Sequence, residues 1–117
     1  MTEAATIPRP APRAPSAPTT PTVAEIAGVL RRHFPQNQAF VFLFGSRANG
    51  TAAPMADWDI GIIAPGPVPG RIMTAARDSL EDLPTLHRFD LVDFATVSPA
   101  FRSAAMAHVV PLVGVPR

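Results

Sequence analysis

The alternation of apolar and polar positions predicts a series of short helices and strands that begins at Thr22. Thr22 and Glu25 form the sequence pattern of a capping box, and apolar residues follow at helical spacing as far as Phe34. Pro35 ends this helix because its ring cannot continue the backbone hydrogen bonds. The next apolar run, residues 39–44, is continuous and short, so it predicts a buried strand rather than a helix.

The same kind of pattern continues to the end of the chain, with proline and glycine marking the boundaries. Residues 46–53 predict a turn with a short helix, and residues 71–83 predict an amphipathic helix. Ser98 and Pro99 have the pattern of a helix start, and the helix continues over residues 101–107. The remaining expected elements are strands over residues 57–64 and 88–94, and over residues 109–115 either a last strand or a tail that packs on a partner.

This order of elements predicts an α/β fold, with a small mixed sheet of three or four strands and helices mainly on one face. Residues 1–21 contain six of the 15 prolines and few large apolar side chains. We therefore expect residues 1–20 to be a disordered Pro-rich tail, because they cannot bury enough apolar surface to offset the entropy of ordering. Residues 21–117 then form one domain, and its small size favours a partner or an oligomer.

Composition excludes several classes of protein. The chain has no cysteine, which rules out disulfides and thiolate metal sites and favours a cytoplasmic location. The formal net charge is +1 and the chain has no lysine, so it has no basic stripe for general nucleic-acid binding. We expect no signal peptide and no membrane segment, because no apolar run has the required length or position.

The first candidate for chemistry is the pair of carboxylates at Asp57 and Asp59. On a strand, residues two apart point to the same face, so both carboxylates would project from one side of the sheet. Oxygen ligands in this arrangement attract hard divalent cations such as Mg²⁺. An isolated pair of this kind is also compatible with two solvated acids at an exposed strand end.

The second candidate is the turn at Gly45 and Ser46, which follows the apolar run of residues 39–44. Glycine lets backbone N–H groups approach a phosphate closely, and the serine hydroxyl adds another donor. Taken alone, a Gly-Ser pair is also typical of an ordinary connection between a strand and a helix. The two candidates together are more specific than either alone, since Asp57 lies 12 positions after Gly45 and both border apolar strands.

The combined pattern resembles the minimal (MNT) nucleotidyltransferases of the DNA polymerase beta-like superfamily. Their hallmark is a Gly-Ser turn in a GSRARG-like segment, followed by two aspartates on a strand in an SDIDIGI-like segment. The corresponding stretches here are GSRANG, residues 45–50, and ADWDIGI, residues 56–62. The resemblance extends over residues 23–112. It implies the polymerase beta-like fold and a metal-dependent nucleotidyltransferase that moves a nucleoside monophosphate, AMP from ATP, to a hydroxyl group.

The resemblance also implies roles for individual residues. Gly45 and Ser46 would hold the nucleotide triphosphate, with Arg47 as either a further phosphate contact or a surface residue. Asp57 and Asp59 would hold Mg²⁺ in a two-metal site. The family's third carboxylate falls at Asp90, which would complete the metal site and activate the acceptor hydroxyl. Asp93 is expected to have a structural role, because it lies on the opposite face of the strand from Asp90.

Minimal members of the family commonly act with a separately encoded, all-helical protein. This protein is either a HEPN-type ribonuclease toxin, which the antitoxin adenylylates on a tyrosine, or a four-helix substrate-binding protein. The segments at residues 83–86, 89–93 and 97–102 are more similar to the second branch. Two departures, Asn49 where Arg or Lys is common and Ala56 where Ser is common, leave an alternative open: a catalytically weak module that neutralises its partner by binding it.

Other residues predict structural roles. Trp58 lies between the two acids and faces the other way on a strand, so we expect it in the core. Gly61, within the same strand, indicates either a close approach to the backbone or mere tolerance of glycine at that position. The three histidines, His33, His87 and His108, have no i, i+4 pair, which makes zinc binding improbable and favours positions at the surface or at helix ends.

Overall fold

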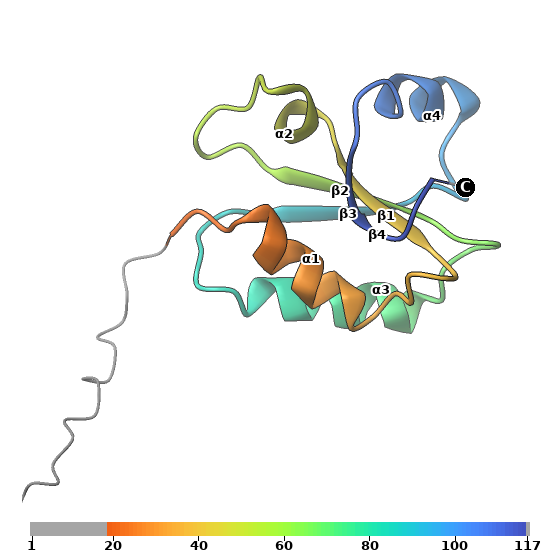
Figure 1. Ribbon diagram of the computed structural model, residues 1–117, viewed down its shortest axis with the longest axis horizontal. Helices are drawn as coiled ribbons and strands as arrows, with labels where there is room; N and C mark the ends of the chain where they lie inside the picture. The colour runs from red at the N-terminus through yellow and green to blue at the C-terminus, as the bar shows by residue number, and fades with distance from the viewer. Residues whose placement is uncertain (1–18, 117) are drawn as a thin grey trace, which may run out of the picture.

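The computed structural model describes residues 19–116 and forms a four-stranded sheet with two layers of helices (Figure 1). The strands are β1 (Phe40–Phe44), β2 (Trp58–Ile63), β3 (Phe89–Asp93) and β4 (Val110–Val113), in the spatial order β3-β2-β1-β4. The central strand β1 pairs antiparallel with β2 and β4, whereas β2 and β3 are parallel. The sheet is therefore mixed, as predicted.

The two longest helices cover one face of this sheet (Figure 1). Helix α1 (Val23–Arg31) begins with the expected capping box: the Glu25 amide donates to Thr22 Oγ1 at 3.0 Å, and the Thr22 amide donates to Glu25 Oε1 at 2.8 Å. Helix α3 (Gly70–Glu81) packs beside it. Leu30, Leu80 and Trp58 are buried in the core between these helices and the sheet, so the prediction for Trp58 is confirmed.

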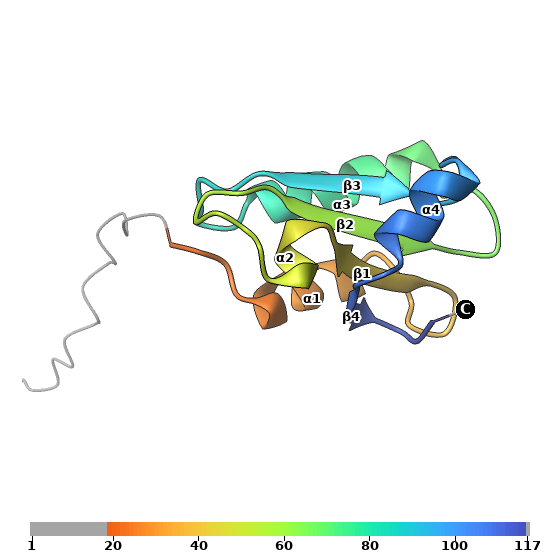
Figure 2. The ribbon, with the colours of Figure 1, turned by 90° about the horizontal axis from the view of Figure 1, so that it is seen from above.

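The shorter helix α4 (Pro99–Ala105) lies over the opposite face (Figures 1 and 2). A cluster of aromatic rings is buried on this face. Phe42 lies at its centre, with ring centroids 4.9 Å from Phe40 and 5.0 Å from Phe94. A Cβ at Gly61 would lie 2.5 Å from the Phe42 ring and 2.6 Å from the Phe94 ring. Of the two alternatives for Gly61, the close approach is therefore confirmed, because these two rings occupy the space that any side chain would need.

Some boundaries differ from the expectation and others agree with it. Helix α2 (Ser46–Asn49) is the short helix expected within residues 46–53, and it ends at Gly50, which has a φ of 82°. Strand β2 begins at Trp58, so Asp57 lies just before it rather than within it. Of the two alternatives for residues 109–115, the last strand is right, because the segment contains β4 (Val110–Val113). The expected tail of residues 1–20 lies outside the described residues except for Thr19 and Thr20. No helix within residues 19–116 is both long and apolar enough to cross a bilayer.

Candidate active site

Two of the predicted acids lie opposite each other in neighbouring strands. In β1 and β2, Phe44 is paired with Asp59, and in β2 and β3, Asp59 is paired with Asp90. Directly paired residues point to the same face of a sheet. Asp59 and Asp90 therefore project from the face that carries the aromatic cluster and α4, at the end of the sheet where β1 leads into α2.

The electrostatics of Asp59 link it to both of the other predicted acids. Its pKa is raised above the ordinary value of 3.8, first by burial and then by the negative charges of Asp90 and Asp57. Asp59 is partly buried, whereas the side chains of Asp57 and Asp90 are exposed. Burial and like charges both disfavour the ionised form of Asp59, so the site has an excess of negative charge that a bound cation would relieve.

The Gly45 turn passes directly over the Asp59 carboxylate. Gly45 has φ 72° and ψ −152°, a backbone conformation that is essentially restricted to glycine. A Cβ at this position would lie 2.5 Å from Asp59 Oδ2. The conformation and the contact each require glycine here, and together they place the backbone before Ser46 against the acidic cluster.

The carboxylate of Asp93, whose role was expected to be structural, accepts hydrogen bonds from two backbone amides. Its Oδ2 accepts a hydrogen bond from the Val68 amide at 2.8 Å, and its Oδ1 accepts one from the Ala95 amide at 3.0 Å. These bonds fasten the loop before α3 and the turn after β3. Both partners of Asp93 are thus backbone amides. This placement supports Asp90 rather than Asp93 as the third acid of the site.

The family of this chain is shown by comparison with known sequences. The family described as polymerase beta, nucleotidyltransferase matches residues 25–114, well over half of the chain. The chain belongs to the polymerase beta nucleotidyltransferase family. Among curated proteins, none matches this chain. The resemblance and the fold class expected from the sequence are thereby confirmed.

Two solved structures with the same fold come from toxin–antitoxin complexes. One is described as a toxin–antitoxin with AMP-PNP, with 23% identity and a TM-score of 0.62 over 81% of this chain and 75% of that chain. Another is a tri-AMPylated HEPN toxin of Shewanella oneidensis in complex with MNT antitoxin, with 21% identity and a TM-score of 0.54 over 80% of this chain and 70% of that chain. At these identities the likeness shows the fold.

The acids of this nucleotidyltransferase domain fit Mg²⁺ bound together with phosphates rather than a preformed metal cage. Within residues 19–116, no three acidic or histidine side chains are grouped closely enough to hold a metal by themselves. Asp57 and Asp90 instead line an open cleft of about 400 Å³. Protein sites commonly hold Mg²⁺ through one or two carboxylates and complete its ligand set with waters and substrate phosphates. The oxygen donors present match that preference.

The structure does not bring Arg47 together with the acids. Its Nη2 lies 2.8 Å from the Ala56 carbonyl oxygen and 3.1 Å from the Pro54 carbonyl oxygen, to which it donates. The guanidinium carbon lies 4.3 Å from the centre of the Trp58 ring, on the side of β2 opposite Asp59. Arg47 thus ties the nucleotidyltransferase α2 helix to the loop that ends at Asp57.

His87 also contacts Arg47, and the sequence did not predict this buried role. Only 9% of its surface is exposed, and its Nδ1 accepts hydrogen bonds from Trp58 Nε1 at 3.2 Å and from Arg47 Nη2 at 3.1 Å. The indole N–H of Trp58 and the guanidinium of Arg47 can only donate, so Nδ1 is the acceptor in both contacts. The expectation of a surface or helix-end position was wrong for His87. Its partners lie 29 and 40 positions away, beyond the reach of any local pattern.

Proposed function

We propose that this protein is a Mg²⁺-dependent nucleotidyltransferase that transfers AMP from ATP to a hydroxyl group on, or presented by, a separately encoded helical partner. The observation that carries the proposal is the position of Asp59. The negative charges of Asp57 and Asp90 both act on Asp59, which is paired with Asp90 across the strands. The Gly45 turn lies directly against its carboxylate. This arrangement joins a turn suited to phosphate with acids suited to a divalent cation, on a fold whose family transfers nucleotides.

Each residue then has a distinct task. The backbone at Gly45 and the hydroxyl of Ser46 would bind the triphosphate, and Asp57, Asp59 and Asp90 would hold Mg²⁺. When bound, Mg²⁺ neutralises the charge that develops on the phosphoryl oxygens in the transition state. Asp90, which is exposed on the open cleft, would orient the acceptor hydroxyl and accept its proton. The hydroxyl oxygen bonds to the alpha phosphorus, and pyrophosphate leaves.

The proposed partner is a HEPN-like helical toxin or a four-helix substrate-binding protein, with this chain acting as an antitoxin in the first case. The support is that two of the similar solved structures are toxin–antitoxin complexes, one of which contains an AMPylated HEPN toxin with an MNT antitoxin. The exposure of Asp57 and Asp90 also leaves their side of the site accessible to an acceptor from another molecule. We place the complex in the cytoplasm, where ATP and Mg²⁺ are available.

Transfer of label from ATP tests this proposal. The tagged full chain, purified with the proteins that bind it, is incubated with Mg²⁺ and ATP labelled on the alpha phosphate. We expect label on a bound protein, lost with Asp59→Ala and retained with Asp78→Ala, which changes an exposed acid on α3. Absence of label on every species, with the partner still bound, would contradict the proposal.

The alternative function is a module that neutralises its partner by binding alone. It is favoured by Asn49, whose side-chain oxygen is held by Thr51 through the amide at 3.0 Å and the hydroxyl at 2.6 Å. A neutral residue there supplies no positive charge for phosphate. The double variant Asp57→Ala and Asp59→Ala distinguishes the two functions, since a binding module keeps neutralising its partner and an enzyme does not.

A further inference from the structure

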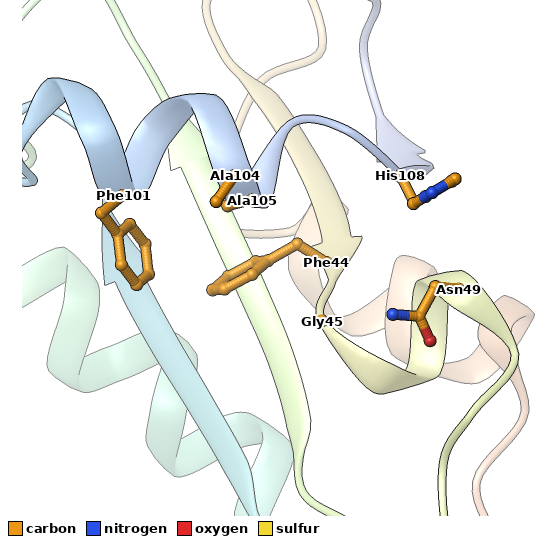
Figure 3. Close-up of a pocket in the computed structure, with 7 residues that line it drawn as sticks. All are labelled: Phe44, Gly45, Asn49, Phe101, Ala104, Ala105 and His108. Carbon is orange, nitrogen blue, oxygen red and sulfur yellow. The ribbon is translucent and has the colours of Figure 1, made fainter.

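A small pocket borders the Gly45 turn on the side of the sheet that carries α4 (Figure 3). Its volume is about 240 Å³. The rings of Phe44 and Phe101 form its aromatic walls, Ala104 and Ala105 line it from α4, and Asn49 and His108 lie at its other end, beside Gly45. None of the roles assigned above uses this pocket.

We propose that this pocket holds the base of the nucleotide whose phosphates lie at the Gly45 turn. The inference rests on the proposed function, because it needs a nucleotide in the site. It adds the part of the protein that recognises the nucleoside end. The occupant is a planar aromatic ring system with hydrogen-bond acceptors on its edge.

The position of the pocket supports a nucleotide rather than an independent ligand. Gly45 lines the pocket and also lies against the Asp59 carboxylate, so the two regions share one residue. A molecule bound through phosphates beside Asp59 therefore has the pocket as its immediate neighbour. At about 240 Å³ the pocket is smaller than most sites that enclose a whole small molecule, which favours one ring system with the rest of the ligand outside.

The walls of the pocket suit the flat face of a base. Phe101 is 43% exposed although its ring centroid lies 5.9 Å from both Phe44 and Phe94. Its neighbours hold the ring in place and leave part of it open. Bases stack on such rings, because every base has an apolar face. The small side chains of Ala104 and Ala105 leave the space that the base would occupy.

Asn49 provides a donor for the edge of the base. The Thr51 amide and hydroxyl both donate to Asn49 Oδ1, which fixes which end of the side-chain amide carries the oxygen. Within the described residues no hydrogen bond from Asn49 Nδ2 to a protein group is found, and Figure 3 shows this nitrogen turned toward the pocket. The residue that departs from the family pattern is thus placed to donate to a base.

Binding measurements with two probes test the inference on the full chain. Calorimetry compares MgATP with magnesium tripolyphosphate, which has the phosphates and no base. We expect Ala104→Leu, which fills the pocket, to weaken MgATP binding about tenfold or more while tripolyphosphate binding is unchanged. Phe101→Leu, which keeps an apolar side chain and removes the ring, should have the same selective effect.

Ser103→Leu is the matched control, because it adds the same side chain one position away, at an exposed residue that does not line the pocket. Unchanged MgATP binding in both Ala104→Leu and Phe101→Leu would overturn the base pocket and leave the proposed function standing. Intact MgATP binding with loss of transfer would also overturn it, by assigning the pocket to an acceptor side chain. If the unaltered protein binds neither probe, the proposed function itself fails, and the inference with it.

Discussion

Gly45 and Asp59 are in contact across the end of β1, and no side chain larger than hydrogen fits between them. A Cβ at position 45 would lie 2.5 Å from Asp59 Oδ2, and the backbone at 45 has the φ of 72° that glycine alone adopts readily. Gly45 and Asp59 are far apart in the sequence, yet they lie side by side on the surface of the site. The chain between the two motifs has the length that allows this contact.

The first prediction concerns Gly45→Ala. We expect nucleotide transfer to be lost, because the new Cβ displaces the Asp59 carboxylate or moves the turn away from it. The strained backbone should also lower the free energy of unfolding by about 1–3 kcal/mol. Chemical denaturation and the label-transfer assay measure the two effects.

Gly28→Ala is the control for this substitution. Gly28 lies within α1, a Cβ there meets nothing within 4 Å, and its φ is not positive. Alanine should raise stability by roughly 0.5–1 kcal/mol because it favours the helix, and transfer should be unchanged. Full activity in Gly45→Ala would show that the contact with Asp59 does not matter for the chemistry.

The second prediction concerns Asp59→Asn in metal-free buffer. Removing the charge relieves repulsion from Asp57 and Asp90, so we expect the melting temperature at neutral pH to rise by about 2–4 °C after allowance for solvent screening. The unaltered protein should be stabilised by MgATP through binding to the folded state, and Asp59→Asn should lose this response. Asp78→Asn, on α3, should retain it. A large fall in the metal-free melting temperature would mean that Asp59 is primarily structural.

The third prediction concerns pH. The folded state holds the Asp59 proton more tightly than the unfolded chain, since its pKa is raised above 3.8. This group therefore favours the folded state most at pH below 3.8, and its contribution is lost as the pH rises through the raised pKa. The melting temperature of metal-free Asp59→Asn, minus that of the unaltered protein, should grow over this interval. A constant difference would contradict the assigned pKa shift.

Sequence patterns predicted the elements whose causes are local. The capping box at Thr22 and Glu25 and the serine cap of α4, where Ser98 Oγ accepts from the Phe101 amide at 3.1 Å, depend on residues three positions apart. The continuous apolar run of β1 identified the central strand, which is covered on both faces. These features can be predicted without knowing what packs against them.

Features that depend on contacts between distant residues could not be derived from local patterns. The acids Asp57, Asp59 and Asp90 were expected only because the sequence resembles a family. In the structure, the pairing of β2 with β3 places Asp59 beside Asp90. Arg47 and His87 are hydrogen-bonded although they lie 40 positions apart in the sequence. No local pattern around either residue predicts this contact. A buried histidine of this kind can be recognised only when its partners are in place.

The last prediction concerns this buried tie and uses Arg47→Met, which keeps the length of the side chain and removes its donors. The carbonyl oxygens of Pro54 and Ala56 lose this donor, and Nδ1 of His87 keeps only the hydrogen bond from Trp58 Nε1. Because hydrogen bonds from a charged group contribute about 1.5–3 kcal/mol each, we expect the free energy of unfolding to fall by at least that amount. The loop that ends at Asp57 should loosen, so transfer should slow.

Arg71→Met is the matched control, because Arg71 is exposed in the first turn of α3. It should change neither stability nor transfer. The comparison also decides between the structural tie and the phosphate contact that the family resemblance implied for Arg47. A structural tie lowers the stability of Arg47→Met in the absence of nucleotide. A phosphate contact instead leaves the melting temperature of the free protein unchanged and weakens the binding of magnesium tripolyphosphate, and that result would reject the structural role.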